Sequence, residues 1–586
     1  MNKKLLIIII AVVVVIATVA IIVFGGNGNT PDLSGNSANS SSSSLIDEEA
    51  DPNRFQLYVS NYDGGFGGAW LEQIKIRYEK QHENDVYETA EGTKTGVQIM
   101  INPIKEKAGA LVDSVLGGPN DVFFTEFAYY YELYEHGILG DITEAVTGDL
   151  SVYNQGDAEG TTIKSKLTEQ QEQYYNIEGK YYGIPHYAGF NGLIYNKRLF
   201  DQNCWYFALN PRGNTLEGKF IQSLSETKSK GPDGVLNTYD DGLPATYDEF
   251  FQLCEWIEGA NNIPVILNGI GYQSYVTALI NALAVNHNGL QESLLNYTFN
   301  GTSSKLVKVL ENGTIVPDAN PTAISLDNGY ELARQAGKAY ALTFAKRLLT
   351  ENQSAYLNEN FDSTSFTHLM AQSQFIRSEY EGPAAMLLDG IWWQSEATSE
   401  FDDASWEFGE GFSKQDSEFL WMPLPHATSE QIGQNTTLYD SIYSMCFMKG
   451  NLTGVKREVA IDFIKFCNTQ ESLVEFTAIT DTPKALNYSL NSDQLNALTP
   501  FAKSLFKVLN DPTTQILYPY ANNDFYKVNQ RMVCESLCAR LDGLDYLHPA
   551  ELFINPDNQK SVYDYFGGMY TRRSTDWETW RSNVIG

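Results

Sequence analysis

Residues 57–70 read LYVSNYDGGFGGAW, a short apolar strand pattern followed by a glycine-rich loop. Further strand patterns lie at 97–101 (VQIMI) and at 121–124 (DVFF), and helical patterns separate the three segments. Strands that alternate with helices are typical of a mostly parallel sheet with helices on its faces. Ligands of such sheets bind at the carboxyl ends of the strands, so we expect the site in the loops that follow them.

The amino-terminal part divides into an apolar segment and a polar one. Lys3 and Lys4 precede an unbroken apolar run at 5–24, which would rise about 30 Å as a helix and cross a bilayer. We expect an uncleaved, single-pass membrane anchor at 1–26, with the lysines cytoplasmic and the folded part extracytoplasmic. Cleavage as a secretory signal is the alternative. Residues 27–53 are polar and Ser-rich, which predicts a flexible linker.

The chain is strongly acidic and rich in aromatic residues. It carries 40 Lys and Arg against 73 Asp and Glu, a formal net charge of −33. Such a surface repels phosphate backbones, so we expect no nucleic-acid partner. The 35 Tyr and 9 Trp supply flat apolar faces with polar edges, which suit sugar rings as well as a protein core.

Seven segments taken together resemble the family 1 extracellular solute-binding proteins, the carbohydrate-type group that includes maltose-binding protein. In chain order they are NYDGGFGGAW (61–70), DVFFTEFAYYYELYEHGILGDIT (121–143), YYGIPHYAGFNGLIYNKRLF (181–200), GPDGVLNTYDDGLPATYDEFFQLCEW (231–256), GPAAMLLDGIWW (382–393), REVAIDFIKFC (457–467) and ILYPYANNDFY (516–526). The resemblance implies an α/β, two-lobed, periplasmic-binding-protein-like fold with a hinge and an interlobe cleft. On that pattern lobe one takes 54–187 and 435–482, and lobe two takes 188–434 and 483–586.

The same resemblance implies the function. A protein of this kind captures a sugar or oligosaccharide by hinge closure and delivers it to an ABC permease in the membrane. It is not an enzyme and needs no organic cofactor. The alternatives are a surface-anchored glycoside hydrolase, which requires two carboxylates flanking the scissile bond, and a ligand-sensing surface protein. The sequence contains no GxSxG elbow, no GxxxxGK[ST] loop and no HExxH zinc motif.

Loops at strand ends supply the first candidate ligand-binding residues. Tyr62 and Asp63 follow the first strand, where glycines let the backbone approach a ligand closely. Thr125 and Glu126 follow the strand at 121–124. A carboxylate at that position can accept two hydrogen bonds from adjacent sugar hydroxyls. The alternative is an acidic residue in the first turn of a helix, facing the positive end of the helix dipole.

A second group follows the apolar run at 384–388 and contains Asp389, Trp392 and Trp393. In the resembled family an aromatic residue after this strand stacks on the sugar ring. Two adjacent tryptophans cannot share one face, and the motif position assigns Trp392 to the cleft and Trp393 to the core. Three tyrosines are further candidates that could equally lie in the core or at the rim. They are Tyr187, Tyr272 and Tyr518.

The acidic loop DGVLNTYDDG (233–242) is a candidate calcium site. Asp233, Asn237, Asp240 and Asp241 offer the hard oxygen ligands that calcium prefers. Their spacing is not that of an EF-hand loop. The alternative is a turn in which these side chains bond their own backbone.

Overall fold

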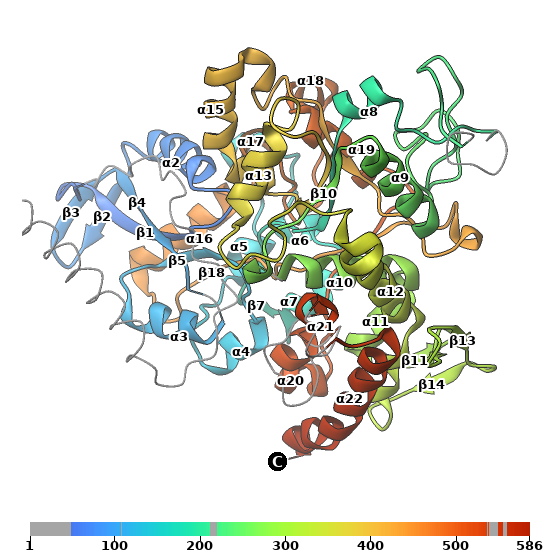
Figure 1. Ribbon diagram of the computed structural model, residues 1–586. Helices are drawn as coiled ribbons and strands as arrows, with labels where there is room; N and C mark the ends of the chain where they lie inside the picture. Colours follow the sequence, from blue (N-terminus) through green and yellow to red (C-terminus); the bar gives the residue numbers. More distant parts are fainter. Residues whose placement is uncertain are drawn as a thin grey trace, which may run out of the picture. The chain divides into compact units, whose positions relative to one another are not determined.

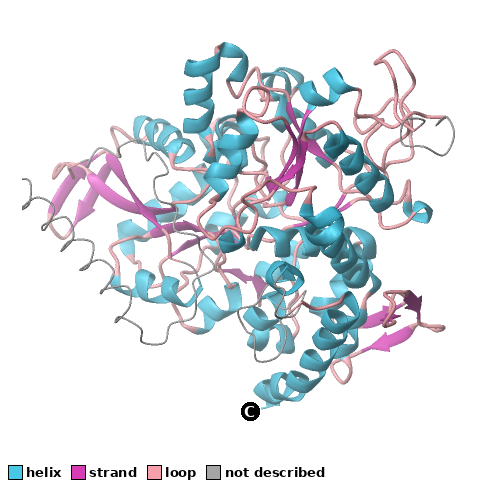
Figure 2. Cartoon of the chain, in the orientation of Figure 1, coloured by secondary structure: helices cyan, strands magenta, loops and turns pink. Residues whose placement is uncertain are grey.

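The computed structural model describes residues 49–106, 108–210, 219–272, 274–535, 537, 549–554 and 559–585. Within these ranges no helix combines the length and the apolar character needed to span a membrane. The predicted anchor at 1–26 lies outside the described residues, as does the predicted linker up to residue 48. Figure 2 shows the strands gathered into separate small sheets with helices around them.

The first large sheet has five strands in the order β4-β1-β5-β18-β8. Strand β1 (Phe55–Tyr62) lies between β4 (Val97–Ile104) and β5 (Val122–Thr125) and runs parallel to both. The predicted parallel arrangement of these three segments is therefore confirmed. Strand β18 (Met445–Met448) runs antiparallel to β5 and to the short edge strand β8 (Ile184–Pro185).

Helices α2 (Ala69–Gln81) and α16 (Gly454–Phe466) pack on this sheet (Figure 1). Helix α2 begins directly after the glycine-rich loop and buries Trp70, Ile74 and Tyr78, which are spaced four residues apart and share one face. In α16 the predicted apolar stripe is confirmed, because its members Val459, Phe463 and Phe466 are all buried.

The second large sheet has the order β10-β15-β9-β16. Strand β15 (Ala384–Gly390) is buried over its whole length, as expected of a continuous apolar strand covered on both faces. It runs parallel to β10 (Ile263–Ile266) and antiparallel to β9 (Asn191–Asn196), and β16 (Phe419–Met422) closes the other side of β9. Helix α10 (Ser274–Asn288) packs against β9 and β15.

The two large sheets use different parts of the chain. The five strands of the first sheet fall within 54–187 and 435–482, and the four strands of the second fall within 188–434. A small parallel sheet of β17 (Thr437–Tyr439) and β19 (Gln515–Leu517) joins segments that pass between them.

The carboxyl-terminal part contacts both lobes. Helix α20 (Asp524–Glu535) comes from the range expected for lobe two, but it packs against α4 (Tyr130–Glu135) of lobe one. The backbone N–H of Tyr131 donates to Oε1 of Gln530 at 2.9 Å.

The remaining longer helices are α3 (Ala108–Gly117), α9 (Tyr247–Gly259), α11 (Leu290–Thr298), α12 (Ala336–Thr350), α13 (His368–Ile376), α15 (Thr398–Phe408), α17 (Gln470–Thr480), α19 (Pro500–Leu509) and α22 (Val562–Ile585). The shorter ones are α5 (Thr143–Thr147), α6 (Ile163–Lys166), α7 (Glu169–Tyr175), α8 (Lys197–Asn203), α14 (Trp393–Glu396), α18 (Ser492–Ala497) and α21 (Pro549–Ile554). Among the described residues there are also short 3-10 helices and four antiparallel strand pairs. The pairs are β2 (Val86–Thr89) with β3 (Gly92–Thr95), β6 (Asn176–Ile177) with β7 (Lys180–Tyr181), β11 (Gly301–Ser303) with β14 (Thr322–Ile324), and β12 (Val307–Val309) with β13 (Ile315–Pro317).

Candidate ligand-binding site

The loops at the carboxyl ends of β1 and β15 meet. Gly65 follows β1 and lies against Trp392, which follows β15: a Cβ placed on Gly65 would be 2.9 Å from Cδ1 of Trp392. A Cβ placed on Gly390, the last residue of β15, would overlap the same indole ring. Both glycines therefore let the ring lie flat against backbone, and any side chain there would displace it.

Three of the predicted residues lie together on the lobe-one side. A Cβ on Gly64 would be 2.5 Å from Cε1 of Tyr62 and 3.4 Å from Oε1 of Glu126, so these two side chains flank the loop. The hydroxyl of Tyr187 donates a hydrogen bond to the same Oε1. The ring of Phe66 packs edge-on against Tyr187 with 4.4 Å between centroids. Burial, together with the nearby carboxylate, raises the pKa of Tyr187, so its phenol stays protonated and remains a donor.

Two other lobe-one candidates point elsewhere. The carboxylate of Asp63 lies 3.3 Å from Nζ of Lys105, at the end of neighbouring strand β4, and both side chains are partly exposed. Thr125 is completely buried, and its hydroxyl donates to the carbonyl oxygen of Glu126 at 3.3 Å. Asp63 therefore adjoins Tyr62 at the end of β1, Thr125 adjoins Glu126 at the end of β5, and both side chains are engaged in local contacts.

On the lobe-two side, Asp389 belongs to a buried polar cluster. Nε2 of Gln372 donates to Oδ2 of Asp389 at 3.0 Å and to Oε2 of Glu396 at 2.8 Å. Nε2 of His368 lies 3.3 Å from Oε1 of Glu396. Burial, and then the charge of Glu396, raise the pKa of Asp389 to about 7. Burial alone would lower the pKa of His368, but the hydrogen bond and charge of Glu396 outweigh it and raise that pKa.

The two adjacent tryptophans separate as the motif position predicts. Trp393 is completely buried and packs against Phe375, Phe401, Phe419 and Phe501. Trp392 is only partly buried. Of the two, Trp392 is therefore the ring that a ligand can reach.

Tyr272 lies beside the cluster that contains Asp389. Its ring centroid is 5.3 Å from that of His368. The ring of Tyr275 is stacked with the same histidine, with 6.3 Å between centroids. Four residues near Asp389 were not predicted from the sequence: Tyr275, His368, Gln372 and Glu396. Tyr275 follows Tyr272 by three residues, about one helical turn, which is a usable signal; the other three come from segments that only the folded chain brings near Asp389.

No family model matches the chain, and no curated protein matches it in sequence. Solved structures do match it. A chitin oligosaccharide binding protein is 14% identical with a TM-score of 0.51, over 90% of this chain and 100% of that one. A protein studied in xylan utilization by the thermophilic bacterium Caldanaerobius polysaccharolyticus is also 14% identical, with a TM-score of 0.50, over 88% of this chain and 100% of the other. The chain has the solute-binding-protein fold. The predicted α/β, two-lobed architecture is thereby confirmed, and at this identity the likeness extends to the fold alone.

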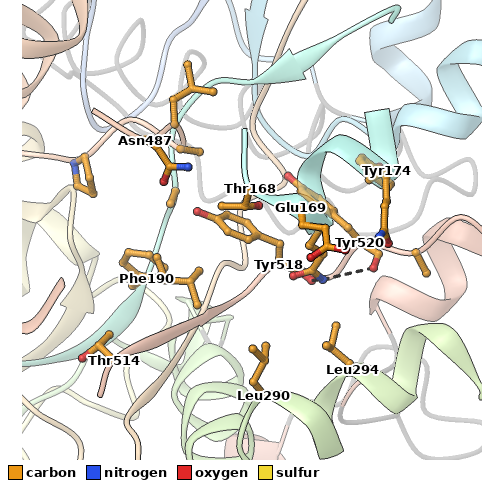
Figure 3. Close-up of a pocket in the computed structure, with 18 of the residues that line it drawn as sticks. Thr168, Glu169, Tyr174, Phe190, Leu290, Leu294, Asn487, Thr514, Tyr518 and Tyr520 are labelled. Atoms are coloured by element: carbon orange, nitrogen blue, oxygen red, sulfur yellow. Dashed lines mark hydrogen bonds between the residues drawn. The ribbon is translucent and has the colours of Figure 1, made fainter. Parts of the chain in front are cut away.

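Within the solute-binding fold, Tyr518 lies apart from the other candidates. It lines a cavity of about 880 Å³ that also includes Ala188 and Phe190 (Figure 3). The neighbouring Tyr187 is paired in extended conformation with Lys484 and directs its side chain to Glu126. Successive side chains of an extended segment point to opposite sides. This cavity and the strand-end site therefore lie on opposite sides of segment 187–190, here called the hinge segment.

The acidic loop at 233–242 bonds largely to itself. Oδ2 of Asp240 accepts from the N–H of Asp233 at 2.9 Å, and Oδ2 of Asp241 accepts from the N–H of Asn237 at 2.8 Å. Burial raises the pKa of Asp240 to about 7. Over the part of the chain that the structure describes, no group of three or more His, Cys, Asp and Glu side chains is placed to hold a metal ion. Calcium binding here stays a prediction.

Proposed function

We propose that this chain is the extracytoplasmic substrate-binding component of an ABC import system, which captures a sugar or oligosaccharide by hinge closure and delivers it to the membrane permease. The observation that carries the proposal is the position of Trp392. Its partly exposed ring, held against Gly65 and Gly390, lies where the strand ends of the two lobes meet. Ligands of open α/β sheets bind at such strand ends.

The residues around Trp392 have the chemistry that a neutral sugar requires. The indole face is a stacking surface for sugar C–H groups. On the lobe-one side, the carboxylate of Glu126 lies beside Tyr62 and can accept hydrogen bonds from vicinal hydroxyls. The two fold relatives support the carbohydrate class, since one is a chitin oligosaccharide binding protein and the other was studied in xylan utilization.

Contacts between the lobes supply the closing mechanism. The hydroxyl of Ser395 in lobe two donates to the carbonyl oxygen of Thr480 in lobe one at 2.8 Å. Nζ of Lys414 lies 3.7 Å from Oδ2 of Asp481. A ligand that touches both lobes adds to such contacts only in the closed state, and this difference in binding free energy drives closure. The predicted anchor at 1–26 would hold the closed lobes beside a permease.

We favour binding without catalysis over a glycoside hydrolase. The nearest pair of carboxylates at the site is Asp389 and Glu396, and a single Gln372 amide bridges them. Asp389 is completely buried, whereas a catalytic carboxylate must reach the glycosidic oxygen or the anomeric carbon.

The test is a saccharide screen on the full chain in detergent, followed by thermal unfolding and by product analysis. A true ligand at about 100 times its Kd should stabilise the fold by about 2.7 kcal/mol and be recovered intact. Release of shorter sugars would favour the hydrolase. Absence of stabilisation by every mono-, di- and oligosaccharide tested would refute the sugar assignment.

A further inference from the structure

The cavity of about 880 Å³ behind the hinge, here called the rear cavity, is built by both lobes. Helix α7 of lobe one and helix α11 of lobe two supply opposing walls, and the segments 483–488 and 518–523 lie between them. In Figure 3, Leu290 and Leu294 project from one helix toward the space beneath Tyr518 and Tyr520. The volume falls within the range of natural small-molecule sites.

One wall of the rear cavity is a row of tyrosine rings. Tyr174 stacks on Tyr520 with 4.1 Å between centroids and an interplanar angle of 7°. Tyr520 lies nearly parallel to Tyr518, with centroids 5.6 Å apart and an angle of 17°. Nε2 of Gln170 donates to the backbone carbonyl oxygens of both Tyr518 and Tyr520, which holds the segment after β19 that carries the rings.

The rest of the lining mixes apolar side chains with polar ones, and few of the polar ones are charged. Its charged residues are Glu169 and Lys484, and Nζ of Lys484 is turned away to Nδ1 of His186 at 2.6 Å. The polar lining consists mainly of amides, each of which offers both donors and an acceptor. These amides are Gln170, Gln173, Gln291, Asn300, Asn487, Asn510, Asn522 and Asn523.

We infer that the rear cavity is a second ligand site, which takes a neutral saccharide. Aromatic rings beside amides match a molecule with C–H faces and many hydroxyls, and the scarcity of charge disfavours an ionic ligand. The site is distinct from the proposed strand-end site, because the two lie on opposite sides of the hinge segment that carries Tyr187 and Ala188.

The rear site is coupled to the hinge. Its walls belong to different lobes, so the width of the cavity changes with the hinge angle. In this structure the strand-end loops touch, through Gly65 and Trp392, while the rear cavity is open. A ligand that fits this cavity therefore stabilises the closed form, and each ligand raises the affinity of the other site by the same factor.

The test is calorimetric titration of the full chain in detergent with glucose, maltotriose and triacetylchitotriose. Leu290→Trp narrows the rear cavity beneath Tyr518 and Tyr520, and Trp392→Ala disables the strand-end site. Lys507→Trp is the control, because Lys507 is exposed on α19 next to the lining residue Phe506 but does not line the cavity itself. We expect two binding events in the unmodified chain and in Lys507→Trp. We expect one event in Leu290→Trp, one in Trp392→Ala, and none when these two substitutions are combined.

A second variant guards against misfolding of Leu290→Trp. The side chain of Asn487 is exposed in the cavity wall, and its backbone N–H donates to the carbonyl of Lys166 at 2.7 Å, which substitution preserves. Asn487→Leu should weaken the rear event about tenfold. A single binding event that is lost in Trp392→Ala and unchanged in both rear variants would overturn the rear site and leave the proposed function standing. A single event that is lost only in Leu290→Trp and Asn487→Leu would support the rear site and overturn ligand binding at the strand-end site.

Discussion

Gly65 of lobe one and Trp392 of lobe two are in contact, so closely that a Cβ on the glycine would lie 2.9 Å from Cδ1 of the indole. The contact joins the first strand-end loop of the chain to a loop more than three hundred residues later. The contact shows that the two lobes are closed against each other where the loops after β1 and β15 lie. It also makes the glycine and the tryptophan the two residues whose replacement should report most directly on ligand capture.

The two adjacent tryptophans should behave oppositely when truncated. Trp392→Ala removes a partly exposed ring, so we expect weaker saccharide binding with a nearly unchanged melting temperature of the ligand-free protein. Trp393→Ala empties a fully buried position among four phenylalanines and should lower the free energy of unfolding by about 3–5 kcal/mol. Thermal unfolding without ligand and calorimetric titration measure the two effects. A large loss of ligand-free stability in Trp392→Ala would show that this ring belongs to the core.

Gly65→Ala should impair closure without damaging the lobes. The added Cβ must push the Trp392 ring aside, and we expect about tenfold weaker ligand binding, equivalent to about 1.4 kcal/mol. Gly68→Ala is the matched control in the same loop, because its Cβ would meet only Nδ2 of Asn61 at 4.0 Å. Titration gives the affinities, and small-angle scattering with ligand gives the degree of closure. Equal affinities of the two variants would contradict this role of the contact.

The buried Lys484 should make stability depend on pH. Burial lowers its pKa to about 7, whereas an unfolded lysine titrates near 10.4. Between these values the unfolded chain binds more protons, so the free energy of unfolding should rise from pH 7 to about pH 10 and fall as the pH is lowered again. Lys484→Met should flatten that slope in urea unfolding.

The aromatic rings around Lys484 act against the effect of burial on its pKa. Nζ lies 4.6 Å from the ring centroid of Trp70 and 4.4 Å from that of Phe476, and such contacts favour the ammonium form. If the unmodified chain and Lys484→Met show the same pH slope, the rings outweigh burial and the lysine is charged at neutral pH.

Asp389 should give the reverse pH dependence at lower pH. Its pKa is raised to about 7, against about 3.9 in an unfolded chain. The folded protein therefore binds more protons between these values, and its free energy of unfolding should fall as the pH rises from about 4 to 7. Asp389→Asn should reduce this slope, whereas His368, whose pKa is also raised, lowers the free energy of unfolding only as the pH rises above about 6.5. An unchanged slope in Asp389→Asn would place the proton on another group of the cluster.

Much of the fold and part of the site could be predicted from residue patterns. The parallel strands at 57–60, 97–101 and 121–124 were predictable because short apolar runs alternate with helical periodicity. The burial of Trp393 and the partial exposure of Trp392 were predictable because adjacent residues cannot share one face. Tyr62, Glu126 and Asp389 were predictable as candidates because they lie at or directly after the carboxyl ends of apolar strands, and the structure shows what surrounds each one.

Other features depend on contacts between distant segments. No neighbouring residue indicates that Tyr518 borders the rear cavity. Its position depends on the pairing of β19 with β17 and on the path of segment 187–190, which contributes to the same cavity. Likewise, the burial of Asp389 and its bridge to Glu396 require Gln372 from α13.

The sequence by itself therefore determined the strands and the apolar helix faces, since these follow from local periodicity. The anchor at 1–26 stays a prediction from the length of its apolar run. Only the tertiary structure decided that Gly65 meets Trp392 and that Tyr518 borders a separate cavity. The physical reason is that local pattern sets which side of an element is apolar, whereas the proximity of two loops depends on where the chain crosses between its sheets.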